Sequence, residues 1–189
     1  FVGNPIRREL LEGSKQEAQK RFKLSREKPL ILILGGSQGA QRINDLILNI
    51  LPQLLENYEI IHQAGPQNFK EVRAESNAIL AEDQLRYYHL YPFLDEIELS
   101  HAYQAADLVV SRAGSGSIFE IAAFGKPSIL IPLPESAQAH QLKNAYFLAQ
   151  EERALVIEEA NLTPHLFLGR LNYLFSHPSE MKKMAQRIK

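Results

Sequence analysis

The feature that most constrains the fold is a run of five consecutive aliphatic residues, Leu30 to Leu34, that ends at Gly35-Gly36. A strand with water on one face alternates apolar and polar residues, whereas a strand buried on both faces is apolar throughout. Between Ile43 and Leu54, apolar side chains then recur at spacings of three and four, which is typical of one face of a helix. The sequence therefore predicts a buried parallel strand, a glycine-rich turn and a helix, in that order.

The same alternation of strands and helices continues along the chain. Strands that are joined by helical crossovers pair in parallel, with helices on both faces of the sheet. We therefore expect one doubly wound, Rossmann-like α/β domain over residues 1–189, with ligands at the carboxyl ends of its strands. Ser14 and Glu17 predict a capping box before the first helix. The expected strands are 30–34, 58–62, 86–90, 107–110, 128–131 and 154–157, and the expected helices are 15–23, 43–54, 66–78, 96–105, 116–124, 138–150, 163–176 and 178–188.

The composition excludes several classes of protein. The 189 residues suffice for one hydrophobic core, and the net charge of −1 gives no global attraction to nucleic acid or to an anionic membrane. The chain has no Cys, which removes disulfides, thiolate nucleophiles and cysteine-ligated zinc or iron–sulfur clusters. No apolar stretch approaches the roughly 20 residues of a membrane-spanning helix. Because the chain begins without Met on the turn-like Gly3-Asn4-Pro5, we expect it to be a piece of a longer protein.

Glycines and a hydroxyl group gather in the turn after the first strand, which reads Gly35-Gly36-Ser37-Gln38-Gly39-Ala40. Glycine lets a ligand approach the backbone closely, and the start of the next helix directs N–H groups at an anion. The turn therefore favours a phosphate site over a purely structural turn, with Gly35, Gly36 and Gly39 as its glycines. A Walker A loop is excluded because no Lys follows, and an NAD site because the second strand ends in His62-Gln63 instead of an acidic residue.

The same turn also satisfies G-x-S-x-G, the nucleophile elbow of α/β-hydrolases, with Ser37 as the nucleophile. Acidic residues and histidines follow in the chain order that such a triad requires. An elbow normally comes after several strands, however, and only 34 residues precede Gly35. A hydrolase is therefore the less favoured alternative.

The turn from Ser111 to Ser117 is also dense in small residues and hydroxyl groups, and it leads into a helix that carries Glu120. The structural alternatives are an N-cap at Ser115 or Ser117 and a first-turn carboxylate at Glu120 that the helix dipole stabilises. Two anion-binding turns at one edge of a sheet favour a ligand-binding role over these structural alternatives. One of them would hold a diphosphate, and Glu120 would accept hydrogen bonds from a ribose diol or a sugar.

The third turn, 132–141, is stiffened by prolines and brings His140, Gln141 and the nearby Asn144 to the start of a helix, where they suit the recognition of sugar hydroxyls. The four aspartates form no D-x-D pair, and neither an H-E-x-x-H motif nor an EF-hand loop occurs. We therefore expect no metal and no cofactor. A leaving diphosphate would be stabilised by helix N-termini and backbone N–H groups.

Taken together and in this order, the motifs resemble the carboxy-terminal half of the family 28 glycosyltransferases, bacterial peptidoglycan enzymes of the two-domain GT-B fold. The resemblance covers about residues 1–158, and the set of motifs is specific although each alone is not. The matching stretches are Gly3–Arg7, Gly35–Ala40, His62–Gly65, Phe93–Asp95, Ala106–Gly114, Glu120–Ala123, Gly125–Pro127, Pro132–Pro134 and His140-Gln141 with Asn144-Ala145.

The resemblance implies an inverting N-acetylglucosaminyltransferase, a hexosyltransferase that moves GlcNAc from UDP-GlcNAc to lipid I and so makes lipid II for peptidoglycan. This half would hold the donor. The missing amino-terminal half would carry the acceptor site, the membrane-facing surface and the catalytic base, so no catalytic residue is expected here and the fragment alone would be inactive. The enzyme would be peripheral on the cytoplasmic side of the bacterial inner membrane, with a role in cell division and cell shape. A related UDP-sugar glycolipid glycosyltransferase and a non-catalytic nucleotide-binding module remain alternatives.

Residue by residue, the resemblance also implies a donor site. The Leu94 backbone would read the uracil edge with Arg7 near the base, and Glu120 would take the ribose hydroxyls. Ser37 and the turn Ser115-Gly116-Ser117 would contact the diphosphate, and His140 and Gln141 the GlcNAc hydroxyls. These roles agree with the phosphate and diol sites expected from the turns, and they make Ser37 a ligand-binding residue instead of a nucleophile. The helix starts after the first and second turns are expected to converge on one pocket.

Overall fold

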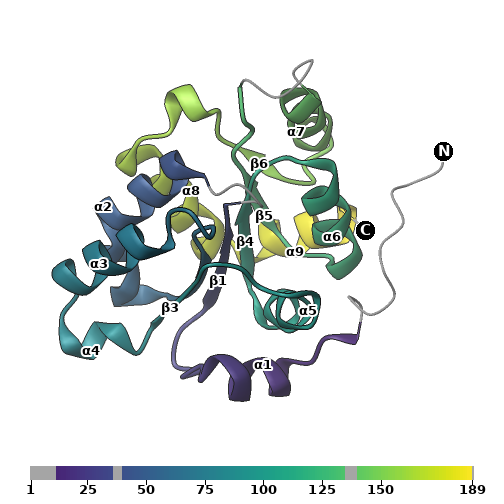
Figure 1. Cartoon of the computed structure of the whole chain (residues 1–189). Coiled ribbons are helices and arrows are strands. Elements are labelled where there is room, and N and C mark those ends of the chain that lie inside the picture. Colours follow the sequence, from purple (N-terminus) through teal and green to yellow (C-terminus); the bar gives the residue numbers. More distant parts are fainter. Residues whose placement is uncertain (1–11, 36–39, 135–139, 189) are drawn as a thin grey trace. The chain divides into compact units, whose positions relative to one another are not determined.

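The computed structural model describes residues 12–35, 40–134 and 140–188 (Figure 1). The chain forms two compact units, a first unit within residues 8–107 and a second unit built from residues 108–189.

The first unit contains three parallel strands in the order β3-β2-β1, which are β1 (Leu30–Leu34), β2 (Glu59–Gln63) and β3 (Tyr88–Tyr91). Every residue of β1 and β2 is buried, as the uninterrupted aliphatic run predicts. β1 and β2 pair residue for residue over their whole length, and Gln63 at the end of β2 lies opposite both Leu34 and Tyr91. The segments that follow the three strands therefore leave the sheet at one common edge.

Helices connect and cover these strands. The α2 helix buries Ile43, Ile47 and Leu51 completely, which confirms the apolar face expected from the sequence. α2 packs beside α3, and α1 packs against α5 (Figure 1). The helices of the first unit are α1 (Lys15–Phe22), α2 (Gln41–Asn57), α3 (Phe69–Ile79), α4 (Glu82–Leu85) and α5 (Glu96–Ala105).

The predicted capping box of α1 is only half correct. Ser14 is the N-cap, and its hydroxyl accepts hydrogen bonds from the N–H groups of Gln16 and Glu17. The reciprocal bond is absent, because the Ser14 N–H donates to His101 Nδ1 at 3.0 Å and the Glu17 carboxylate pairs with Lys20 Nζ at 3.0 Å. A partner on α5, far away in the sequence, thus replaces the local one.

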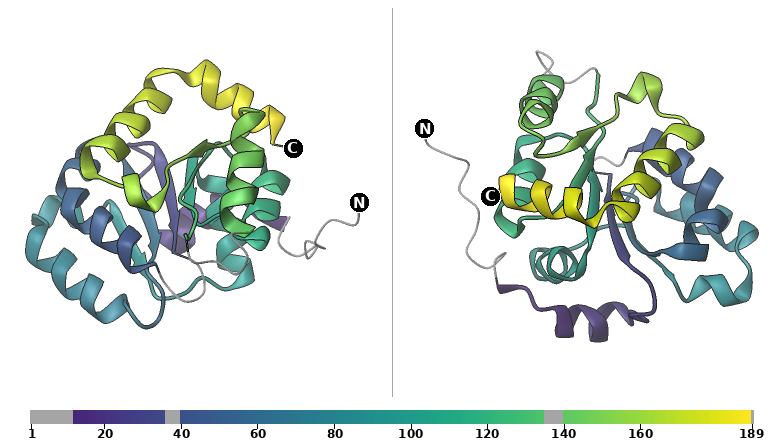
Figure 2. Two further views of the ribbon diagram at one scale, coloured as in Figure 1. Left: turned by 90° about the horizontal axis from the view of Figure 1, so that it is seen from above. Right: turned by 180° about the vertical axis from the view of Figure 1, so that it is seen from behind.

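The second unit contains three further parallel strands in the order β4-β5-β6, which are β4 (Leu108–Ser111), β5 (Ser128–Leu130) and β6 (Leu155–Val156). α8 buries Phe167, Leu171 and Leu174, and α9 packs beside α8 and follows it directly in the chain (Figure 2). The helices of this unit are α6 (Ser115–Phe124), α7 (His140–Gln150), the 3-10 helix η3 (Glu159–Asn161), α8 (Pro164–Ser176) and α9 (Pro178–Arg187).

All of the expected strands and helices are present, with ends that shift by a few residues. Among the described residues, α4 and η3 were not expected, and both are too short to produce a hydrophobic period. β6 has two residues instead of the four expected. None of the helices within the described ranges is long and apolar enough to cross a bilayer.

Candidate functional site

The candidate site of the second unit begins where α6 starts. Gly114 is the N-cap, with φ −67° and ψ 148°, and no side chain caps the helix. The first N–H groups of a helix lack partners within it, so the amides of Ser115, Gly116 and Ser117 are presented at an uncapped, positive helix end. A Cβ at Gly114 or Gly116 would meet no described heavy atom within 4 Å. The alternative that Ser115 or Ser117 is the N-cap is wrong, because both lie inside the helix.

Hydrogen bonds hold this turn against the neighbouring segments. Arg112 Nη1 donates to the Ile131 carbonyl at 3.2 Å, and the same guanidinium forms an ion pair with Glu159. Asn144 Nδ2 donates to the Ala113 carbonyl at 3.4 Å, which places the start of α7 beside the turn. Because Arg112 is already paired with a carboxylate, it acts as a structural cation, and the amides of α6 remain the groups suited to an anion.

Glu120 lies on the second turn of α6, so the alternative of a first-turn carboxylate is wrong. It follows Gly116 by four residues and therefore lies on the same face of the helix, about 6 Å further along the axis. Glu120 is half-buried. A helix end without a side-chain cap has the chemistry to bind an anion, and a carboxylate one turn further along the same face has the chemistry to accept hydrogen bonds from hydroxyl groups.

The predicted sugar-binding residues lie at the start of α7. His140 is the first residue of the helix and is exposed. Gln141 is half-buried, and its Oε1 accepts the N–H of Leu133 at 3.0 Å, which fixes the side chain beside the turn after β5. Together with Asn144, Gln141 therefore fastens the start of α7 to the turns that follow β4 and β5.

The candidate site of the first unit lies at the carboxyl ends of its strands. The Gly35 N–H donates to the Gln63 carbonyl at 3.2 Å. A Cβ at Gly35 would lie 3.0 Å from the Ala40 nitrogen and 3.3 Å from the Gln63 oxygen, so packing itself requires glycine there. Leu94 is buried, and its N–H donates to Gln63 Oε1 at 3.0 Å. One residue, Gln63, thus contacts both the start of the predicted phosphate turn and the predicted base-reading segment.

A second buried network lies beside Gln63. His62 is fully buried, with Nδ1 2.8 Å from the Tyr88 hydroxyl and Nε2 3.1 Å from Asn44 Oδ1. Asn44 Nδ2 donates to the Ala64 carbonyl at 3.1 Å. Burial lowers the pKa of His62 to about 3, so the imidazole is neutral at physiological pH. The network fastens the first turns of α2 to the end of β2.

The structure brings some predicted residues together and leaves others aside. Gly35 and Leu94 meet through Gln63, and the start of α7 meets the turn before α6. The sequence alone indicates no role for Gln63 or Arg112, although both stand directly at strand ends, where ligand sites of this fold class occur. The remaining predicted contacts, Arg7, Gly36, Ser37 and Gly39, lie outside the described residues.

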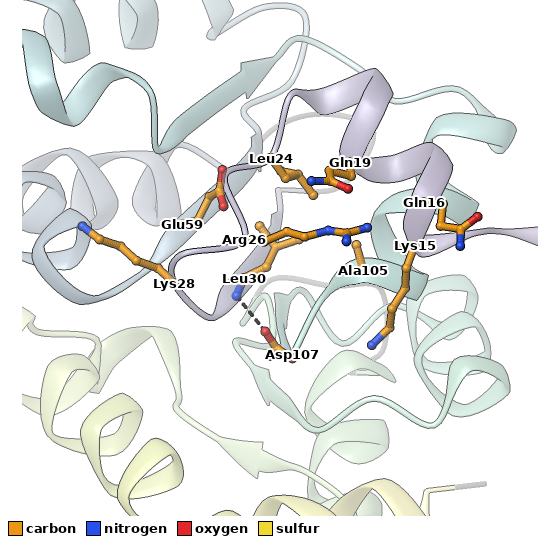
Figure 3. A pocket seen from close by; sticks show the side chains of 10 residues that line it. All are labelled: Lys15, Gln16, Gln19, Leu24, Arg26, Lys28, Leu30, Glu59, Ala105 and Asp107. Atoms are coloured by element: carbon orange, nitrogen blue, oxygen red, sulfur yellow. Dashed lines mark hydrogen bonds between the residues drawn. The ribbon is translucent and has the colours of Figure 1, made fainter.

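A cavity of about 450 Å³ lies in the first unit at the opposite, amino ends of the strands. Leu30 and Glu59 line it, and each is the first residue of its strand. In Figure 3 the Arg26 side chain extends along this cavity beneath α1, whereas Lys28 points the other way. The Glu59 carboxylate is already bound by the Ser25 N–H at 2.9 Å and by His89 Nε2 at 2.8 Å. Because parallel α/β sheets bind ligands at their carboxyl ends, this cavity is not the candidate site.

The chemistry of the described residues points to recognition by hydrogen bonds. Within residues 12–35, 40–134 and 140–188, no three His, Asp or Glu side chains are grouped as a metal ion would need. The groups present at the strand ends are backbone amides, hydroxyls, carboxamides and Glu120. They match a ligand that combines phosphate with several hydroxyl groups.

Parallel strands linked by helices, with helix starts at the carboxyl ends, define a Rossmann-like α/β fold, doubly wound, of the kind that forms one half of a GT-B glycosyltransferase. Residues 30–189 match the model of the "Glycosyltransferase family 28 C-terminal domain". The chain belongs to this family, and the resemblance and fold class expected from the sequence are confirmed.

Two curated relatives of this chain carry the same name. The chain is 40% identical to a protein of Christiangramia forsetii, covering 100% of this chain and 50% of that protein, and 38% identical to one of Clostridium kluyveri, covering 92% and 47%. Both are named UDP-N-acetylglucosamine--N-acetylmuramyl-(pentapeptide) pyrophosphoryl-undecaprenol N-acetylglucosamine transferase. The crystal structure of Acinetobacter baumannii MurG superposes with a TM-score of 0.73 at 26% identity, covering 100% of this chain and 52% of that one. The chain thus spans about half the length of the curated relatives it matches.

Proposed function

We propose that this chain is the donor-binding half of an inverting N-acetylglucosaminyltransferase that transfers GlcNAc from UDP-GlcNAc to lipid I and forms lipid II. The observation that carries the proposal is the start of α6, where an uncapped helix end and Glu120 lie on one face. The names of the relatives supply the sugar, because hydroxyl-binding groups alone do not distinguish GlcNAc from other hexoses.

In this proposal the diphosphate binds at the start of α6. The amides and hydroxyls of Ser115, Gly116 and Ser117 donate to the phosphate oxygens, with Ser37 and the glycines of the first turn as further contacts. The helix end carries a positive partial charge and already points its N–H groups outward, so the leaving diphosphate is stabilised without a metal ion. Ser37 is then a phosphate contact.

The remaining contacts complete the proposed donor site. Glu120 accepts hydrogen bonds from the two ribose hydroxyls, about one helical turn away from the phosphate contacts. The Leu94 backbone reads the uracil edge, with Arg7 near the base. His140 and Gln141 bind the GlcNAc hydroxyls at the start of α7. No residue of this chain acts as the catalytic base.

The acceptor, the base and the membrane contact belong in this proposal to an amino-terminal half of the enzyme. Lipid I binds there, and the whole enzyme works as a peripheral protein on the cytoplasmic face of the inner membrane, in cell-wall synthesis that supports cell division and cell shape. The chain alone is then expected to bind donor weakly and to transfer nothing.

Calorimetric titration of the chain with UDP-GlcNAc, UDP-galactose, ADP and NAD tests the donor class. We expect UDP-GlcNAc to bind more tightly than ADP and NAD, since the base and the diphosphate are both recognised. A chain that prefers ADP or NAD would contradict the proposal, and a preference for UDP-galactose would indicate a related glycolipid enzyme.

A further inference from the structure

Gln63, the last residue of β2, contacts both parts of the candidate site in the first unit, Gly35 after β1 and Leu94 after β3. Only 6% of it is exposed, yet it carries a polar carboxamide. A buried polar side chain persists where its hydrogen bonds are made, because leaving them unmade costs free energy. The contacts of Gln63 therefore indicate what it is there to hold.

The main chain of Gln63 fixes the start of the phosphate turn. Its carbonyl accepts the Gly35 N–H at 3.2 Å, directly after β1 ends. The same oxygen lies 3.3 Å from the position of a Cβ at Gly35, so a larger residue there would have to displace this contact by a few tenths of an ångström. The exit of the chain from β1 into the turn is set by this contact.

The side chain of Gln63 fixes the segment after β3. Its Oε1 accepts the Leu94 N–H at 3.0 Å within the core. Phe93 beside it is 55% exposed, whereas the Leu94 side chain is buried, so apolar packing of Leu94 anchors the segment and the hydrogen bond to Gln63 orients the Leu94 N–H. On the other side, Asp95 caps α5 through the Glu98 N–H at 2.8 Å. The Leu94 peptide is thus pinned between a side-chain acceptor and a helix cap.

We propose that Gln63 is a positioning residue that holds the Leu94 peptide of the base-reading segment at a fixed separation from Gly35, and so sets the preference of the site for its base. This inference rests on the proposed function, since it assumes that Leu94 faces the base of a nucleoside diphosphate. Gln63 acts through Gly35 and Leu94 and does not itself touch the donor.

The chemistry of the bases makes the inference testable. Uracil presents a donor at N3 where cytosine presents an acceptor, while UDP and CDP share the same ribose and diphosphate. The ratio of their affinities therefore reports on the base-reading segment alone, because any change in the contacts to phosphate affects both ligands equally. A loosened Leu94 peptide accommodates either base.

The test compares the affinities of UDP and CDP for the chain and its variants by calorimetry. Gln63→Met keeps the length of the side chain but removes the carboxamide, and we expect the preference for UDP over CDP to fall at least tenfold. Gln63→Glu keeps an oxygen acceptor at the same distance, and we expect it to restore most of that preference. The matched control is Tyr88→Phe, which removes the hydroxyl from His62 in the adjacent network but leaves Gln63 and Leu94 intact, and it should keep the wild-type ratio.

A second measurement covers the case in which Gln63→Met does not fold. In the wild-type chain without ligand, hydrogen exchange at the Leu94 amide should be slow, since its N–H is already bound by Gln63. An unchanged UDP-to-CDP ratio in Gln63→Met, or fast exchange at Leu94, would overturn the inference. A wild-type chain that binds no UDP at all would instead overturn the proposed function.

Discussion

Gly114→Asp should make the chain more stable and its donor binding weaker. Gly114 is the N-cap of α6, its backbone angles lie in the extended region that capping residues adopt, and a Cβ there meets no described atom within 4 Å. The new carboxylate would accept hydrogen bonds from the amides of Gly116 or Ser117. It would thus occupy the groups that the proposal assigns to the diphosphate and place a negative charge beside them.

Gly114→Asp is expected to raise the free energy of unfolding and to lower the affinity for UDP, and the two magnitudes are separate. A side-chain cap, the helix dipole and the lost flexibility of glycine each contribute a few tenths of a kcal/mol, so the free energy of unfolding should rise by about 1 kcal/mol. A diphosphate that loses two hydrogen bonds to charged oxygen loses about 3 kcal/mol, which weakens UDP binding by roughly 100-fold. Charge repulsion adds to this loss.

Urea denaturation measures the first quantity and calorimetric titration with UDP the second. Ala81→Asp is the matched control, because Ala81 precedes α4 with similar backbone angles, φ −71° and ψ 156°, and the proposal places no ligand there. It should leave UDP affinity unchanged. If Gly114→Asp is stabilised and still binds UDP within threefold of the wild type, the diphosphate does not bind at the start of α6.

Two further predictions concern pH. Because burial lowers the pKa of His62 from its ordinary value of 6.5 to about 3, this residue should cost the folded chain about 1.4 kcal/mol of stability for each pH unit between 6.5 and about 3. His62→Gln should remove this part of the slope, and an equal slope in both proteins would contradict the prediction. Burial alone would raise the pKa of Glu59, but hydrogen bonds from His89 and Ser25 outweigh burial, so the pKa is lowered. The Glu59 carboxylate therefore stabilises the fold at pH values above its ordinary pKa of 4.5, and this stabilisation is lost as the pH falls through the folded-state pKa. Glu59→Gln should lower the free energy of unfolding by about 1–3 kcal/mol at pH 7 and much less at pH 3, as urea titration at the two pH values would measure, and an equal loss at both would refute it.

The sequence predicts the longer strands and helices well, because each of them follows from a run or a period of apolar residues. The run Leu30–Leu34 has no polar interruption and is buried along its whole length, and α2 buries the residues that recur at helical spacing. The capping box is a local pattern as well, but its prediction is confirmed only for the hydrogen bonds that the Ser14 hydroxyl accepts within α1. The reciprocal contact depends on His101, which is 87 positions away.

The contacts of the candidate site are less predictable from the sequence, because they too join residues that are far apart in the chain. Glycine-rich turns at strand ends predict where a ligand binds, and α6 starts directly after the turn that follows β4, but the ligand contacts stay predictions. The roles of Gln63 and Arg112 depend on which segments the fold brings beside them, Leu94 in one case and Glu159 in the other. No spacing in the chain relates these pairs, so only the folded structure identifies them.

The most direct test of the account is a calorimetric titration with UDP in excess EDTA, carried out on the wild-type chain and on Glu120→Ala. We predict that one molecule of UDP binds the wild type with the metal chelated, and that the loss of the ribose contacts weakens binding at least tenfold in the variant. Binding that requires a divalent metal, or equal affinity in both proteins, would contradict the claim that a helix end and Glu120 hold the donor.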